Sequence, residues 1–302
     1  MSVSVVKNEN ENVSLTRSAA GVGAGYATFV GGKKALRKTI GKSYSNYLFN
    51  HVGKIQPAEN DTFWRAANQA FQTSPLTNKD VKIVNLTPSN FETFRDDTLA
   101  KIIKPINKKG WAGKIQKKLL DRKIKKFKKS LYAISLGKNA CYIPATKTVA
   151  LNKNKMSFST FHELGHSINH ASKGFAGKLH KNRKYFALLA PVILLTSLLT
   201  KKKSKDEKPK NTKEKITTFI RKNCGKLMFA CMIPTLAEEG LASVNANKLA
   251  KKVLSPELLK KMNSLNTKAW GTYLLGATIT GACGALAVWV KDKIAQPKIA
   301  NN

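Results

Sequence analysis

Uncharged, largely apolar residues gather in four runs along the chain, and lysine-rich stretches separate them. The runs cover residues 18–32, 185–200, 227–237 and 270–290. The last run is 21 residues long, with Trp270 and Trp289 near its ends and Lys268 and Lys291 beside it. This length, together with aromatic and lysine anchors, is typical of a transmembrane helix. We therefore predict that 270–290 crosses a membrane, with a buried core helix as the alternative.

The three earlier runs are shorter or interrupted. Segment 18–32 is short for a span, but Gly21 and Gly25 lie four residues apart, which suits close packing of helices in a membrane. Pro191 interrupts the second run, which predicts either a kinked span or a buried helix. The resulting segments are a polar N-terminal tail at 1–17, an apolar segment at 18–32, and an apolar helical hairpin at 185–237 with a basic loop at 201–226.

Residues 33–184, between the first two runs, are polar enough and long enough for a domain of their own. Helical periodicity and β-branched alternation both occur there. The pattern predicts helices over 62–74 and 111–131, and strands over 81–87, 140–144 and 148–152. The fold class expected is therefore α+β, mainly helical with a small sheet, plus the hydrophobic helices.

The charge balance is strongly basic, with 54 Lys and Arg against 17 Asp and Glu, a net charge of +37. Such a chain attracts anionic partners. In the helix predicted at 111–131, Trp111, Ile115 and Leu119 are spaced by four and most polar positions are lysine. This helix either lies on anionic lipid or has a solvated face above the domain core. No zinc finger, helix-turn-helix or RNA-binding aromatic pattern accompanies the charge, so we expect no nucleic-acid partner.

The strongest chemical signal is His162-Glu163-Leu164-Gly165-His166, an H-E-x-x-H motif. On a helix, histidines four apart share one face, so both imidazoles can reach one Zn²⁺. Glu163 then lies beside the metal-bound water as a general base. Ser157 or Ser159 is positioned to cap this helix.

A catalytic zinc site also needs a third protein ligand and an open position for water. The metzincin pattern requires Gly at 169 and His at 172, whereas the chain has Asn169 and Ser172, so that class is excluded. His170 lies on the same helical face, but three ligands on a straight helix spread over about 12 Å and cannot close on one ion. We expect His170 to support the site or to be solvated.

The pair of strands followed by H-E-x-x-H resembles the active-site sheet and helix of zincin metalloproteases. In the gluzincin class the third ligand is a glutamate from a later helix. Glu239-x-x-Ala242-Ser243 resembles the E-x-x-A-D segment of the HtpX heat-shock and CAAX prenyl membrane proteases, and residues 239–242 also resemble the E-G-x-A segment of aminopeptidase-type gluzincins. The resemblance implies Glu239 as the third ligand and Glu238 as the alternative. Ser243 stands where the membrane proteases have an aspartate that supports a ligand histidine.

The same resemblance implies a zincin-like domain at 33–184, a ligand-helix region at 238–268 and one Zn²⁺ per chain. In zincins the edge strand of the sheet binds an extended substrate through main-chain hydrogen bonds. The residues that this assigns to substrate binding are Ala140, Cys141, Tyr142 and Ile143.

The function expected is that of a membrane-associated zinc metalloendopeptidase acting on peptide or protein substrates, membrane proteins among them. Glu163 would move the proton, and His180, Arg183, Tyr185 or Tyr273 could stabilise the oxyanion. Two alternatives stay open. One is a basic membrane-bound scaffolding protein with a non-catalytic zinc site, and the other is a soluble zincin with the apolar runs as core helices.

The charges do not fix the orientation in the membrane. Lysine and arginine close to the predicted spans are equally numerous on the two sides of the membrane. The N-terminus lacks the features of a secretory signal. The four cysteines are far apart without a C-x-x-C pair, which suggests neither a disulfide framework nor a zinc ribbon. We therefore expect a multi-pass protein with its catalytic side in the cytoplasm.

Overall fold

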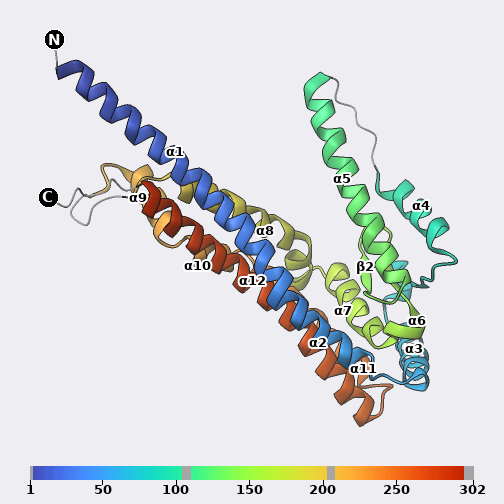
Figure 1. The fold of residues 1–302 in the computed structure, drawn as a ribbon. Coiled ribbons are helices and arrows are strands. Elements are labelled where there is room, and N and C mark those ends of the chain that lie inside the picture. Colours follow the sequence, from blue (N-terminus) through green and yellow to red (C-terminus); the bar gives the residue numbers. More distant parts are fainter. Residues whose placement is uncertain (1–2, 104–109, 203–207, 296–302) are drawn as a thin grey trace. The chain divides into compact units, whose positions relative to one another are not determined.

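The computed structural model describes residues 3–103, 110–202 and 208–295, which are mainly helical with a small three-stranded sheet (Figure 1). The strands are β1 (Lys82–Asn85), β2 (Cys141–Ile143) and β3 (Thr148–Leu151). The helices are α1 (Val3–Leu36), α2 (Lys42–Val52), α3 (Pro57–Gln72), α4 (Phe91–Ile102), α5 (Gly110–Ser135), α6 (Lys153–Met156), α7 (Thr160–Ala171), α8 (Phe175–Leu199), α9 (Thr212–Lys222), α10 (Cys224–Ala230), α11 (Ile233–Ala250) and α12 (Pro256–Ala295). The coarse fold class predicted from the sequence is confirmed.

These residues form two compact units. The helical unit comprises the described parts of Met1–Asn46, Asn182–Leu236 and Gly271–Asn302, and the sheet unit comprises those of Tyr47–Lys181 and Ala237–Trp270. The chain passes from one unit to the other within α2, α8, α11 and α12. The H-E-x-x-H motif, Glu238 and Glu239 all belong to the sheet unit.

The elements predicted between residues 62 and 152 are confirmed with shifted ends. Helix α3 begins earlier than predicted, since Pro57 occupies its first position and Gln56 and Glu59 form a capping box. The polar tail predicted at 1–17 is helical from Val3, and it continues into the apolar segment as one helix, α1.

The sheet has the order β1-β3-β2, with β1 parallel and β2 antiparallel to β3. Strand β3 is buried along its whole length because each face of the sheet is covered. Val149 and Leu151 join the core cluster that contains Phe63 and Phe161 of α3 and α7. Ala150, which points the other way, joins the cluster around Leu131 and Ile134 of α5. Strand β2, which carries Cys141 and Tyr142, lies at one edge of the sheet.

Helix α7, which bears the motif, packs backbone to backbone on α11. A Cβ on Gly165 would lie 2.1 Å from the carbonyl oxygen of Ala242, and Ala242 is fully buried. Only glycine permits this approach. The contact brings the face of α7 with His162 and His166 against the part of α11 that carries the two glutamates.

The start of α7 differs from the prediction. Ser159 is the N-cap residue, but its hydroxyl donates to the carbonyl of Met156, and that of Ser157 donates to the carbonyl of Lys153. Neither hydroxyl accepts from α7. The predicted side-chain cap is therefore wrong, because both hydroxyls donate to carbonyl groups of the preceding helix α6 instead.

In the helical unit, glycines allow three helices to approach closely. A Cβ on Gly25 would lie 2.7 Å from the carbonyl oxygen of Ala287 and 2.7 Å from Leu198, and one on Gly21 would lie 2.9 Å from the carbonyl oxygen of Lys291. Gly21 and Gly25 thus serve close helix packing, as their spacing predicts.

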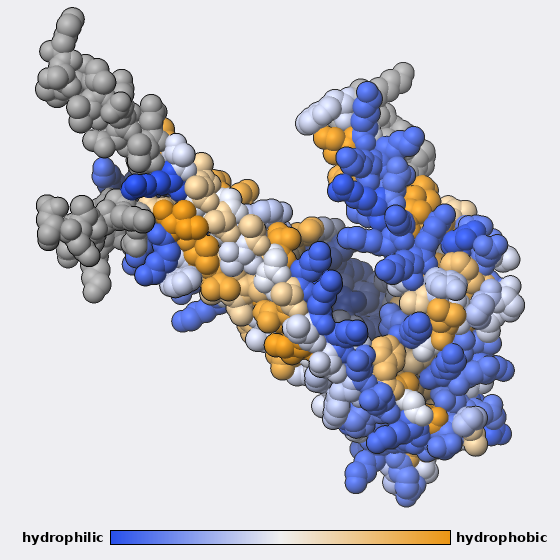
Figure 2. Space-filling view, in the orientation of Figure 1, coloured by the Kyte–Doolittle hydropathy of each residue, from blue (hydrophilic) through white to orange (hydrophobic). Residues whose placement is uncertain are grey.

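Helix α8 of this unit is apolar on both sides. Ala190, Leu194 and Leu198 are buried, whereas Leu188, Val192, Leu195 and Leu199 are exposed. Hydrophobic atoms also cover much of the surface over α1 and α12 (Figure 2). A helix that is apolar all round suits lipid rather than water.

Three stretches of helix are long and apolar enough to cross a membrane: Phe175–Leu199, Cys224–Ala250 and Pro256–Ala295. This is compatible with the predicted membrane location. Among the described residues, the segment 18–32 within α1 does not join them. The second stretch extends past Glu238 and Glu239, because residues 240–246 continue with mostly small or apolar side chains.

Candidate metal centre

Three ligand atoms converge between α7 and α11. The Nε2 atoms of His162 and His166 lie 3.2 Å and 3.3 Å from Oε2 of Glu239, and the two imidazole rings are nearly perpendicular. Four ligands held about 2.0–2.1 Å from a zinc ion in a tetrahedron are about 3.3–3.4 Å apart. Both N–O distances thus match the edge of such a tetrahedron, and these three residues can hold a metal ion.

Each motif histidine has its other ring nitrogen occupied. Ser243 Oγ lies 3.2 Å from Nδ1 of His162 and 3.1 Å from the carbonyl oxygen of Glu239. The hydroxyl has one proton, which it donates to that carbonyl, so it accepts the proton of His162 Nδ1. The lone pair of His162 is then on Nε2, which faces Glu239. Ser243 thereby fixes the tautomer that metal binding requires.

Glu238 holds Nδ1 of His166 in the same way, which leaves Nε2 as the nitrogen available to a metal ion. Nδ1 of His166 lies 2.9 Å from Oε1 of Glu238, a carboxylate with no exposed surface, so Nδ1 donates and Nε2 faces Glu239. Burial alone would lower the pKa of His166, but hydrogen bonds to Glu238 and Glu239 outweigh it and raise that pKa to about 10. A cation bound at Nε2 would take the place of this proton.

Glu238 is the centre of a larger buried hydrogen-bond network. Its Oε1 also accepts from Nδ1 of His180 at 2.7 Å and from the side-chain amide of Asn169 at 3.1 Å. The oxygen of that amide accepts in turn from Asn245. His166, His180 and Glu238 could also hold a metal ion. Their N–O distances of 2.7 and 2.9 Å are shorter than a tetrahedral edge and suit charge-assisted hydrogen bonds, so we interpret this group as support for His166.

Glu163 follows His162 on α7 and is buried. Its charge contributes to the raised pKa of His166. Burial, followed by the charge of Glu163, raises the pKa of the Cys141 thiol as well. Glu163 therefore lies near both His166, a candidate metal ligand, and Cys141 of the edge strand β2.

His170 belongs to neither group of metal-binding side chains in the described structure. Its Nδ1 lies 2.9 Å from the hydroxyl of Tyr142 on β2. Burial raises the pKa of Tyr142 to about 12, and burial followed by the charge of His180 lowers the pKa of His170. Both groups are thus neutral near pH 7, and the tyrosine can donate to the imidazole. The contact ties the edge strand to the end of α7.

The sequence predicts the three residues that converge. It does not predict that Asn169 and His180 support the site through their hydrogen bonds to Glu238. The structure brings His162, His166, Glu239 and Ser243 together. Glu238 contacts Nδ1 of His166, whereas the candidate metal position is at Nε2. Asn169 was noticed only as a departure from the metzincin pattern, although it lies three residues after His166 on the same face. The sequence offers His180 as a donor to the oxyanion, whereas in the structure its Nδ1 is hydrogen-bonded to Glu238. Arg183, Tyr185 and Tyr273 belong to the helical unit.

Comparison with protein-family models, with curated proteins and with solved structures finds no match to this chain.

Proposed function

We propose that the protein is a membrane-associated zinc metalloendopeptidase of the gluzincin type. The observation that carries the proposal is the convergence of His162 Nε2 and His166 Nε2 on Glu239 Oε2, at distances that match a tetrahedral edge, with Glu163 next to His162 on the same helix. Two nitrogens and one carboxylate oxygen are the ligand set that catalytic zinc uses in hydrolases, with the fourth position left for water. When bound, zinc supplies Lewis acidity toward the scissile carbonyl and a water of lowered pKa.

The protein's own residues would carry the other parts of the reaction. Glu163 takes the proton of the attacking water and passes it to the leaving amine. Strand β2 is at the edge of the sheet and could pair with an extended peptide through main-chain hydrogen bonds. Glu238 and Ser243 keep the two imidazoles in the ligating tautomer, so little reorganisation is required during the reaction.

The arrangement favours an open site over a closed structural one. A closed site needs a fourth protein ligand, for which Glu238 and His170 are the candidates that the sequence suggests. Glu238 approaches Nδ1 of His166 and not Nε2, and Nδ1 of His170 is bonded to Tyr142. This supports the enzyme over the scaffolding alternative.

The test is zinc content per chain and cleavage of an unfolded protein such as casein, measured on the same preparations. Wild type and Glu163→Gln should hold about one zinc, because Glu163 is not a ligand, while Glu239→Ala should lose most of it. Glu163→Gln should lower the turnover number by about 10²–10⁴-fold, the usual contribution of a general base. Glu92→Gln and Glu92→Ala, at an exposed glutamate of α4, are the matched controls.

The outcomes separate the alternatives. Wild type without zinc would end the metalloprotease proposal, and so would a Glu163→Gln variant as active as wild type. Stoichiometric zinc with no cleavage of any unfolded substrate by wild type would favour the scaffolding protein. Removal of zinc by a chelator should abolish activity, and added zinc should restore it.

A further inference from the structure

Helix α5 carries two apolar stripes on different sides. At about 100° per residue, Trp111, Ile115 and Leu119 fall within an arc of about 80°, and the centre of the second stripe lies about 150° away. The second stripe faces the protein, since Leu131 is fully buried and Phe127 packs on the cluster that covers the sheet. It consists of Leu120, Ile124, Phe127 and Leu131. From the sequence, either stripe could pack on the protein. In the described structure it is the second stripe that does so.

The first stripe, here called the outer stripe, points away from the core. Trp111 is 79% exposed, Ile115 40% and Leu119 51%. An orange patch near the start of α5, with blue side chains next to it, is visible in Figure 2. Moving a tryptophan and two aliphatic side chains out of water is favourable, so an apolar partner that covers this helical face would gain free energy of binding.

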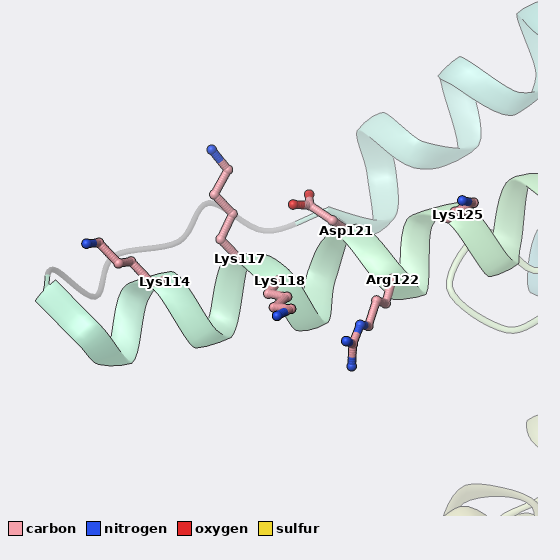
Figure 3. Close-up of a pocket in the computed structure, with 6 residues that line it drawn as sticks. All are labelled: Lys114, Lys117, Lys118, Asp121, Arg122 and Lys125. Atoms are coloured by element: carbon pink, nitrogen blue, oxygen red, sulfur yellow. The ribbon is translucent and has the colours of Figure 1, made fainter.

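Basic side chains border the outer stripe on both sides. Between Gly110 and Ser130 the chain has nine lysines and arginines and one acidic residue, Asp121, and all nine basic residues are exposed. Figure 3 shows several of them projecting from α5 into open space, Lys117 and Arg122 toward opposite sides of the helix. Asp121 cannot neutralise this charge.

We propose that the outer stripe of α5 binds the surface of an anionic lipid bilayer. Such a helix places its apolar face about 5–10 Å into the headgroup region, and tryptophan prefers that depth. Lysine and arginine extend their charged ends toward the lipid phosphates, so both features of the helix are satisfied by one surface. A nucleic acid would pair with the charge and leave the outer stripe in water. The proposal does not depend on peptidase activity.

The test is photo-crosslinking in the full-length protein. A benzophenone amino acid replaces Trp111 or Ile115, and the protein is reconstituted in nanodiscs of phosphatidylcholine, with or without phosphatidylglycerol. After illumination, mass spectrometry identifies what has been attached. Tyr132, exposed at the other end of α5, is the negative control position. Leu286, exposed on the apolar part of α12, is the positive control for lipid.

Lipid adducts are expected at 111 and 115 with phosphatidylglycerol present, and they should be lost without it, in high salt, or when Lys118, Arg122 and Lys125 are all changed to Gln. Adducts at 286 should be unaffected by these changes. The proposal is overturned if 286 gives lipid adducts while 111 and 115 give none, or if adducts at 111 do not depend on the anionic lipid. Adducts to a second copy of the chain, or to nucleic acid supplied in the same reaction, would likewise overturn it.

Discussion

Glu238 and Glu239 are neighbours in sequence, yet their carboxylates have different partners. Successive residues of a helix point about 100° apart, so the two side chains reach His166 from different sides. Oε2 of Glu239 approaches Nε2, and Oε1 of Glu238 approaches Nδ1. Consecutive residues of α11 therefore contact both nitrogens of the His166 imidazole, and these two contacts fix the orientation of the ring.

From this we predict that Glu238→Gln weakens zinc binding by about 10–100-fold, the usual effect of removing the partner of a ligand histidine. The neutral amide still fits but attracts the His166 and His180 protons less strongly. Competition with a chromogenic zinc chelator measures the affinity. Ser243→Ala, which removes a neutral partner of His162, should have a smaller effect. An unchanged affinity in Glu238→Gln would mean that Glu238 does not hold His166.

The sequence predicts the chemistry-bearing residues well and their supporting residues poorly. His162 and His166 are recognisable because four residues of helix bring them to one face, a local property. The partnership of Glu238 with His180 and Asn169 joins residues 58 and 69 positions apart. It depends on how α7, α8 and α11 pack, which no local pattern contains.

At the scale of elements, the position of α7 against α11 depends on the absence of a side chain at Gly165. The helices meet where Gly165 faces the main chain of Ala242. The predicted strands and helices of the sheet unit are similarly determined by local pattern, whereas their pairing is not. Nothing in the sequence of β1 indicates that it pairs parallel with β3 across the intervening α4 and α5.

We predict that Gly165→Ala destabilises the protein by about 3 kcal/mol or more and lowers its zinc content, because the added methyl group would force α7 and α11 apart. Gly240→Ala is the matched control, since its Cβ would meet nothing closer than 3.9 Å and alanine favours helix. Denaturant unfolding in detergent and metal analysis measure both effects. Equal stability of the two variants would show that the close approach of the helices is not required.

At the scale of the whole molecule, three helical stretches are long and apolar enough to cross a membrane, and one of them contains Glu239, the third residue of the candidate metal centre. The apolar runs were predictable from composition, because hydropathy is a property of each segment by itself. How far each run extends was not, since α8, α11 and α12 continue beyond the uncharged residues into the sheet unit.

We predict that the protein stays in the membrane fraction after washing with alkaline carbonate and requires detergent for extraction, because lipid-facing side chains such as Leu188 and Leu195 have no other cover in the described structure. Immunoblotting of the fractions decides this. Release by carbonate, with a monodisperse protein in detergent-free buffer, would instead favour the soluble zincin.

The division of the chain between the two units also sets an order of events during synthesis. The histidines emerge from the ribosome first, then residues 182–236 of the helical unit, and only afterwards Glu239. A nascent chain that has not yet made its second apolar stretch has two imidazoles and no third ligand. The three candidate ligands are thus present together only late in synthesis, on chains that have already made their first apolar stretch and much of their second.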